Sequence, residues 1–230
     1  MHQRALAKLT LSLHAVGVRA DGMHLIDAEM VTIDFADVLT FSDGDGLDIA
    51  GREAPDDETN TVRRALAAVR RSAHVRLEKH IPAGAGLGGG SADAAAVLRW
   101  AGCDDVGVAA SIGADVPFCM IGGRARVTGI GEIVDPLPFE DRTFTLFTPP
   151  VAVSTVEVYR RWDDLGGPTG DNGNDLEPAA LAVAPDLARW RNELGDATGL
   201  TPRLAGSGST WFVEGAFPGA GRVVTRTDRP

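Results

Sequence analysis

The sequence predicts an α+β protein with two lobes. Segments with the alternation of strands are interspersed with segments of helical periodicity along the 230-residue chain. This length suits one large domain or two small ones. The pattern of predicted strands, helices and loops changes near residue 140. A glycine-rich run lies between a predicted strand and a predicted helix. We therefore expect an N-terminal lobe over residues 1–140 and a C-terminal lobe over residues 141–230.

The first predicted strand covers residues 7–16, in which apolar and polar residues alternate. Its polar face carries Lys8, Thr10, Ser12 and His14. These side chains either line a cleft or face solvent. An Asp-Gly turn follows within residues 18–24, and a second strand region within residues 29–42. The acidic, turn-rich segment 44–57 is expected to be an exposed connection.

A helix is predicted to start after Asn60, which is a good N-cap, and a strand is predicted over residues 74–81. Lys79 has the same parity in this strand as Val75 and Leu77, which is unusual for a buried face. Its amine either reaches a ligand or extends along the surface to water.

The glycine run follows this strand, with five glycines within residues 84–90. Glycine allows a ligand to approach the backbone closely, and the N-terminus of the next helix, predicted over residues 91–101, offers unpaired N–H groups and a partial positive charge. The run therefore predicts a phosphate site. Asp93 in the first helical turn would repel a phosphate, so it should point away or act through a cation.

Other kinds of phosphate loop fit this run less well. Gly84, Gly86 and Gly89 match G-x-G-x-x-G, but the preceding strand is half charged and residues 101–104 do not form the expected apolar strand. No Lys-Ser/Thr pair follows the glycines, which excludes a Walker loop. A nicotinamide-dependent dehydrogenase stays as an alternative function.

The remainder of the chain continues the α+β pattern. Asp115 lies just before Pro117 and is either a helix N-cap or a functional acid. Strands are predicted over 124–131 and 143–148, and helices over 155–162 and over 176–194, the latter broken at Pro185. Residues 163–174 are expected to be a loop, and residues 202–214 a strand, a glycine turn and a strand.

Composition limits the partners and the location. The net charge of −10 and the pI near 4.9 argue against nucleic acid or an anionic membrane as a partner. The two cysteines, Cys103 and Cys119, have no CxxC spacing, so disulfide scaffolds and zinc sites are not expected. The start of the chain lacks the features of a secretory signal. We expect a cytoplasmic protein; its sequence does not indicate an oligomeric state.

Several motifs in order along the chain resemble those of the GHMP kinases. The glycine run with Pro82 and Ser91 is similar to their phosphate loop. Further motifs resemble the 4-diphosphocytidyl-2-C-methyl-D-erythritol kinases of the non-mevalonate isoprenoid pathway; these are the stretches 7–11, 19–24, 113–117, 174–178 and 204–209. This resemblance implies a two-lobed GHMP kinase fold, with an N-terminal lobe like ribosomal protein S5 and a ferredoxin-like C-terminal lobe.

The resemblance also implies site residues and cofactors. Lys8 and Asp115 would be the catalytic pair, and His24 would recognise cytosine, with Thr10 and Met23 also at the substrate. Met23 stands where the family usually has an aromatic side chain. ATP would be the phosphoryl donor, accompanied by Mg²⁺, for which no carboxylate ligand is assigned. The residues expected to hold ATP are Pro82, Ala83, Gly84, Ala85, Gly86, Leu87, Gly88, Gly89, Gly90, Ser91 and Ala92.

The implied reaction is ATP-dependent phosphorylation of the 2-hydroxyl group of the methylerythritol moiety. The small-molecule substrate would then be cytidine diphosphate methylerythritol. Two alternatives remain beside it: a kinase of the same fold for a different alcohol, and a nucleotide-binding protein of this fold without catalytic activity.

Overall fold

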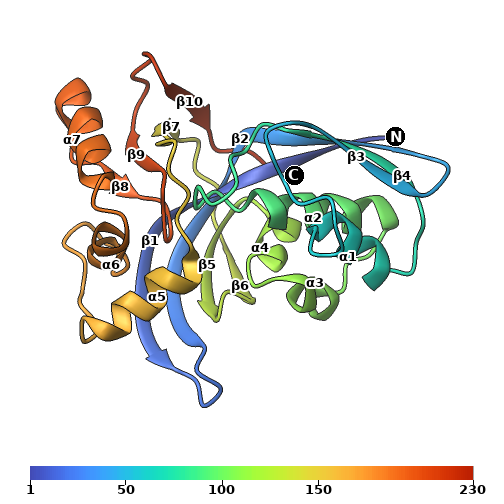
Figure 1. The fold of residues 1–230 in the computed structure, drawn as a ribbon, viewed down its shortest axis with the longest axis horizontal. Helices are drawn as coiled ribbons and strands as arrows, with labels where there is room; N and C mark the ends of the chain where they lie inside the picture. The colour runs from blue at the N-terminus through green and yellow to red at the C-terminus, as the bar shows by residue number, and fades with distance from the viewer. Residues whose placement is uncertain (230) are drawn as a thin grey trace.

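Two long antiparallel strands, β1 (His2–Val18) and β2 (His24–Ser42), run through the middle of the molecule (Figure 1). The structure is a computed structural model that describes residues 1–229. β1 extends beyond the predicted range, and its pairing with β2 is interrupted by shifts of register, two of which flank Lys8 and Thr10. These irregularities help to explain why Lys8, Leu9 and Thr10 are all buried although neighbouring residues of a regular strand face opposite sides.

The first sheet is built around β2. It has the order β3-β4-β2-β5-β6, with β1 paired to β2 outside this path. The additional strands are β3 (Gly46–Gly51), β4 (His74–Lys79), β5 (Arg124–Gly129) and β6 (Ile133–Leu137). The prediction of a connection over 44–57 is wrong in its middle, because β3 pairs in parallel with β4. β3 is an edge strand with a polar exposed side, so its sequence resembles that of a loop.

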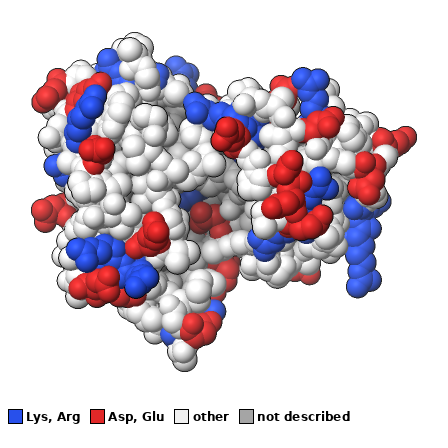
Figure 2. All heavy atoms as spheres, viewed as in Figure 1, with Lys and Arg blue, Asp and Glu red and all other residues white. Residues whose placement is uncertain are grey.

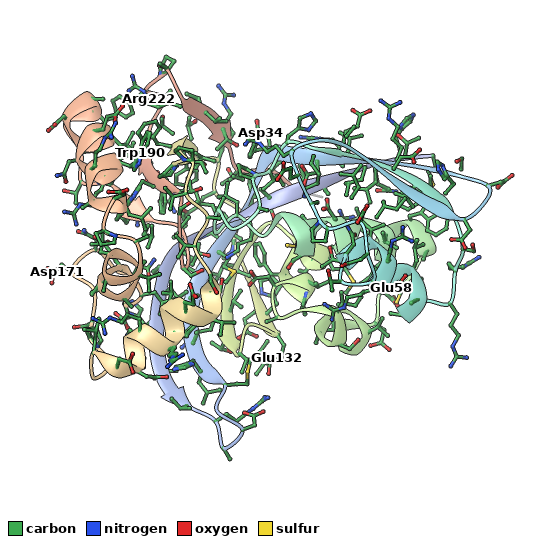
Figure 3. The ribbon with its side chains drawn as sticks, in the orientation of Figure 1. Asp34, Glu58, Glu132, Asp171, Trp190 and Arg222 are labelled. Atoms are coloured by element: carbon green, nitrogen blue, oxygen red, sulfur yellow. The ribbon has the colours of Figure 1, made fainter. Side chains whose placement is uncertain are left out.

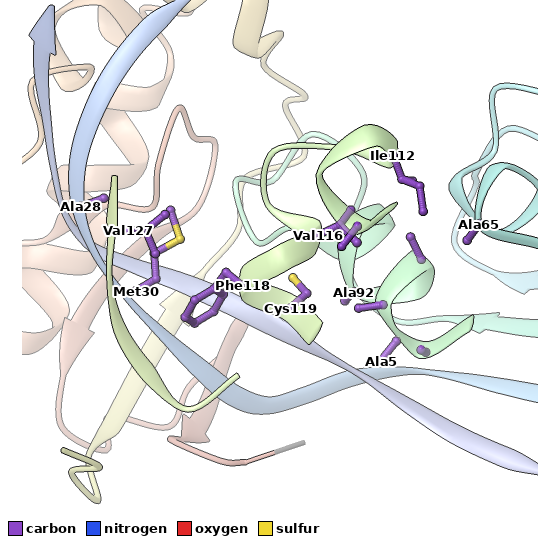
Figure 4. Close-up of a cluster of buried hydrophobic side chains, with 14 of the residues drawn as sticks. Ala5, Ala28, Met30, Ala65, Ala92, Ile112, Val116, Phe118, Cys119 and Val127 are labelled. Atoms are coloured by element: carbon purple, nitrogen blue, oxygen red, sulfur yellow. The ribbon is translucent and has the colours of Figure 1, made fainter. Parts of the chain in front are cut away.

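Four helices form the rest of the N-terminal half: α1 (Thr61–Ala68), α2 (Gly89–Ala101), α3 (Val106–Ile112) and α4 (Val116–Ile121). Asn60 caps α1 as predicted, since its side chain accepts a hydrogen bond from the N–H of Val62 at 2.8 Å. Figure 4 shows Phe118 of α4 beside Met30 of β2 in the core. The buried alanines of α2, such as Ala92, allow this central helix to lie close to its neighbours.

A second sheet is formed by residues 143–226. Its order is β10-β7-β9-β8, and all its strands are antiparallel: β7 (Thr143–Phe147), β8 (Arg203–Leu204), β9 (Trp211–Glu214) and β10 (Arg222–Arg226). The accompanying helices are α5 (Thr155–Asp164), α6 (Glu177–Val183) and α7 (Leu187–Thr198). The predicted break at Pro185 is confirmed, because it lies between α6 and α7. The sequence patterns did not predict β6 and β10.

Most charged side chains lie at the surface. Asp34, Glu58 and Asp171 are exposed on different parts of the molecule (Figure 3). The two lysines differ, because Lys8 is 6% and Lys79 is 4% exposed. Within residues 1–229, no helix combines the length and the apolar character needed to cross a membrane.

Candidate functional site

A cavity of about 490 Å³ lies where the two halves of the molecule meet. Its lining comes from the strands β1, β2 and β4, from the glycine loop 82–90, and from residues 54–61, 114–115 and 206–207, with Tyr159 of α5. Figure 2 shows the hollow between the halves, with acidic and basic atoms inside it. The glycine loop, Lys8 and Asp115, which lie far apart in the sequence, thus line one space.

The glycine loop is held rigidly against the second half. Gly84, Gly86 and Gly88 all have positive φ angles, between 66° and 76°, a conformation that favours glycine. A Cβ atom at Gly86 would overlap the carbonyl oxygen of Ala205. The Thr210 N–H donates to the oxygen of Ala85 at 3.1 Å. The loop therefore needs glycine for close packing, and it leads directly into the N-terminus of α2.

Lys8 and Asp115 form an ion pair in the cavity. The Lys8 Nζ lies 3.4 Å from the Asp115 Oδ2 and donates a hydrogen bond to the Thr10 hydroxyl at 3.0 Å. A Cβ at Gly88 would lie 2.7 Å from the Lys8 Cγ, and one at Gly206 would lie 3.4 Å from the Nζ. The lysine side chain is thus confined between the glycine loop and the loop after β8. The polar face of β1 lines a cleft at Lys8.

Asp115 occupies the N-cap position of α4 without capping the helix. Its side chain makes no capping hydrogen bond and is 30% exposed. The N-cap interpretation of this residue is therefore wrong for its carboxylate, because the charge faces Lys8 instead. A carboxylate that is half-exposed, next to a buried amine and beside a phosphate-type loop can accept a proton from a bound hydroxyl group.

Lys79 does not extend to water, because its side chain is 4% exposed, and it lines the cavity. Its Nζ donates to the Asp93 Oδ2 at 2.8 Å and to Asp37, and all three side chains are buried. Asp37 also accepts hydrogen bonds from the backbone N–H groups of His80 and Ile81. This buried triad of Asp37, Lys79 and Asp93 ties β2, the end of β4 and the first turns of α2 together around the glycine loop.

Electrostatics distinguish the two carboxylates of the buried triad. Asp37 has hydrogen bonds to both oxygens, whereas the Asp93 Oδ1 is buried without a partner in residues 1–229. Burial raises the pKa of Asp93 to about 7, against the opposing charge of Lys79. The sequence predicted that Asp93 points away from a bound phosphate or acts through a cation. In the structure its side chain points inward and pairs with the amine of Lys79.

Of the predicted substrate residues, Met23 and His24 are at the end of the β1–β2 hairpin, and Thr10 is in the middle of β1. His24 stacks on Tyr159 of α5 with ring centroids 4.6 Å apart. Met23 is 45% exposed and, like His24, does not line the cavity. Thr10 is buried below Lys8 rather than open to the cavity. The structure thus brings His24 to α5, but it does not bring Met23 or Thr10 into the cavity lining.

Sequence reasoning missed Tyr159, which connects the two ends of the site. Burial, followed by the negative charge of Asp115, raises the pKa of its hydroxyl well above the usual range. Two features of composition point to the site: Tyr159 is the single tyrosine, and the two lysines both line the cavity. Neither signal depends on a motif.

The motif around Asn174 has a structural role. The Asn174 side-chain amide donates to the carbonyl oxygens of Leu204 and Gly206 at 2.8 and 2.7 Å. The neighbouring Asp175 accepts a hydrogen bond from the N–H of Ala15 on β1. These contacts fix the loop beside Lys8 against β1, and Leu176 of the same motif lines the cavity.

Metal binding by side chains alone is not supported. No group of three or more His, Cys, Asp or Glu side chains within residues 1–229 is arranged to hold a metal ion. Ser91 and Asp115 line the cavity and offer oxygen atoms, which suits Mg²⁺ bound mainly through a ligand's phosphates and water.

Comparisons with known proteins agree on one family. The family model described as GHMP kinases N terminal domain matches residues 60–123. A Cereibacter sphaeroides protein named 4-diphosphocytidyl-2-C-methyl-D-erythritol kinase is 37% identical over 90% of this chain and 87% of its own length. A Ruegeria pomeroyi protein of the same name is 39% identical over 94% and 88%.

Solved structures show the same relationship. A crystal structure of 4-(cytidine 5'-diphospho)-2C-methyl-D-erythritol kinase has a TM-score of 0.79 and 28% identity, and covers 99% of this chain and 100% of that one. A homoserine kinase from Cytophaga hutchinsonii, with 18% identity and a TM-score of 0.56 over 97% and 94% of the two chains, shares the fold. The predicted α+β GHMP kinase fold is confirmed.

Proposed function

The chain belongs to the 4-diphosphocytidyl-2-C-methyl-D-erythritol kinase family, and we propose that it phosphorylates the 2-hydroxyl group of 4-diphosphocytidyl-2-C-methyl-D-erythritol with ATP. The observation that carries this proposal is the ion pair of Lys8 and Asp115, 3.4 Å apart in a cavity that the glycine loop also lines. The dehydrogenase alternative is not retained, because the relatives and the fold are those of kinases.

The glycine loop is the proposed ATP site. Residues 82–92 hold the phosphates through backbone N–H groups, because the first N–H groups of α2 have no acceptor within the helix. Residues 54–61 line the same cavity next to the loop and take the nucleoside of ATP. In this proposal the boundary between the lobes lies at residue 140. Residues 1–140 hold ATP, and both lobes contact the substrate.

Phosphoryl transfer needs positioning and charge neutralisation more than covalent chemistry. Asp115 accepts the proton of the substrate hydroxyl group as the oxygen attacks the γ-phosphorus and ADP leaves. Lys8 pairs with the Asp115 carboxylate and offsets negative charge on the moving phosphoryl group. The two loops on either side of Lys8 fix the position of its amine, so the amine is already in place for the reaction when the substrates bind.

Bound together with ATP, Mg²⁺ would neutralise negative charge on the phosphates. The Ser91 hydroxyl group at the start of α2 is the side chain that would contact it. The head group of the substrate lies toward His24 and Tyr159. Reaction in the cytoplasm, where ATP is present, fits this assignment.

The proposal is tested by incubating the protein with ATP, Mg²⁺ and 4-diphosphocytidyl-2-C-methyl-D-erythritol and following ADP release. We expect turnover with this substrate and none with mevalonate or homoserine. Turnover only with one of the other alcohols would refute the substrate, and absence of turnover with all of them would support a noncatalytic nucleotide-binding protein.

The role of Asp115 is tested by the variant Asp115→Asn. Loss of the general base should lower kcat by about 10²–10⁴-fold, with a small change in KM for ATP. The exposed Asp104→Asn variant is the control. An Asp115→Asn enzyme with the kcat of the control would remove Asp115 from the chemistry.

A further inference from the structure

An aromatic cluster surrounds His24 at the end of the β1–β2 hairpin. The imidazole stacks on Tyr159 at 4.6 Å with the rings inclined by 29°, and its edge meets Trp162 at 5.6 Å and 85°. Trp162 is itself held by a hydrogen bond from its Nε1 to the oxygen of Pro168 at 2.8 Å. The His24 side chain is only 11% exposed. The plane of the imidazole is therefore set by α5.

Asp163, on the same helix, determines which ring nitrogen carries the proton. The His24 Nε2 lies 2.8 Å from the Asp163 Oδ1. An ionised carboxylate only accepts hydrogen bonds, so the neutral imidazole must have its hydrogen on Nε2. The Nδ1 atom is then an acceptor, and it has no hydrogen-bond partner within residues 1–229.

We propose that Asp163 is a positioning residue that fixes His24 as a hydrogen-bond acceptor at Nδ1 and so selects a substrate base with an exocyclic amine. This inference rests on the proposed function and on contact between His24 and the base. Cytosine carries an amine donor at C4, whereas a uracil carries a carbonyl acceptor there. An acceptor at Nδ1 pairs with the first base and repels the second.

The variant Asp163→Asn tests this selection because an amide can either donate or accept. Asparagine therefore permits both tautomers of His24, and Nδ1 is no longer fixed as an acceptor. Asp164→Asn is the matched control, since Asp164 is the next residue of α5 and is exposed. Asp163→Glu restores an anionic acceptor and should recover part of the selectivity.

The measurement is kcat/KM at pH 8 for the cytidine substrate and for its uridine analogue. We expect Asp163→Asn to reduce the cytidine-to-uridine ratio about tenfold or more, since one base contact is worth that much discrimination. The change should be in KM for the cytidine substrate, with kcat and KM for ATP unchanged. In a His24→Ala background, adding Asp163→Asn should change nothing further.

Binding of CDP and UDP, followed by calorimetry, separates this inference from the proposed function because it needs no turnover. The inference is overturned if Asp163→Asn keeps the same preference for CDP over UDP as Asp164→Asn. It is also overturned if Asp163→Asn alters the preference equally in the His24→Ala background. CDP preference that depends on Asp163 in a protein without kinase activity would retain the inference and refute the function.

Discussion

Replacing Lys79 by methionine removes the cation of the buried triad and keeps the length of the side chain. Lys79 is 4% exposed, and its Nζ bonds the buried carboxylates of Asp37 and Asp93. Breaking a buried ion pair from one side costs about 3–5 kcal/mol because the remaining charge is uncompensated. For a chain of this size, the melting temperature should fall by about 6–20 °C.

The loss should depend on pH in a defined direction. Burial raises the pKa of Asp93 to about 7, so this carboxyl is protonated at pH 5.5 and largely ionised at pH 8. The charge of Lys79 lowers this pKa, so without Lys79 the pKa of Asp93 rises further. At pH 8 the folded variant must therefore hold either an uncompensated buried carboxylate or a proton that the unfolded chain releases, whereas at pH 5.5 Asp93 is neutral in both proteins. The destabilisation of Lys79→Met should therefore be larger at pH 8 than at pH 5.5.

Urea unfolding followed by tryptophan fluorescence at the two pH values measures this difference. Arg76→Met on the same strand is the control, because its pair with Glu78 is exposed and should contribute less than about 1 kcal/mol. Adding Asp93→Asn to Lys79→Met should recover part of the free energy. A loss no larger than that of Arg76→Met, or a larger loss at pH 5.5, would refute the reasoning.

Three further predictions concern the loops and the pH dependence of stability. Gly86→Ala should lower the free energy of unfolding by more than the roughly 1–2 kcal/mol that a left-handed backbone conformation costs a residue with a Cβ, and it should raise KM for ATP. The control is Gly102→Ala, at a position with a similar φ angle and open space around the added Cβ, which should show only the backbone cost. In wild type, between about pH 4 and 7, Asp93 is protonated in the folded protein but ionised in the unfolded chain, so the stability that this group contributes falls as pH rises. In a plot of the urea midpoint against pH, Asp93→Asn should flatten this part of the curve. Asn174→Ala should leave the Gly206 carbonyl unpaired and cost about 1–3 kcal/mol, and thermal melting that matches wild type would contradict this.

Features set by short stretches of chain were predicted well. The cap at Asn60 and the break near Pro185 each depend on a few neighbouring residues. Backbone sterics and local hydrogen bonds act over that range. The failure at β3 has the opposite cause, because that strand exists through its pairing with β4 rather than through its own composition.

The candidate site needed partners that are distant in sequence. Lys79 meets Asp37, which is 42 residues away, and His24 meets Asp163, which is 139 residues away. In the sequence, Lys79 had two open interpretations. Extension to water was wrong, because the side chain is 4% exposed, and no local signal shows that a strand lysine will be enclosed by two carboxylates. For Asp115 the local pattern left a helix cap and a functional acid open, and its pairing with Lys8 was implied only by the family resemblance; the fold places the two side chains 3.4 Å apart.

By itself, the sequence determined that the chain is an α+β protein with a glycine-rich loop leading into a helix, because glycine content and helix ends are local properties. The family resemblance implied that Lys8 and Asp115 act together, but only the tertiary structure shows the contacts and gives Lys79 its partners. Lys8 pairs with Asp115 and Lys79 with Asp37 and Asp93, because the register of β1 and β2 and the packing of α2 and α4 set the positions of these side chains. The chemistry of the cavity follows from those distances, which no stretch of the sequence encodes alone.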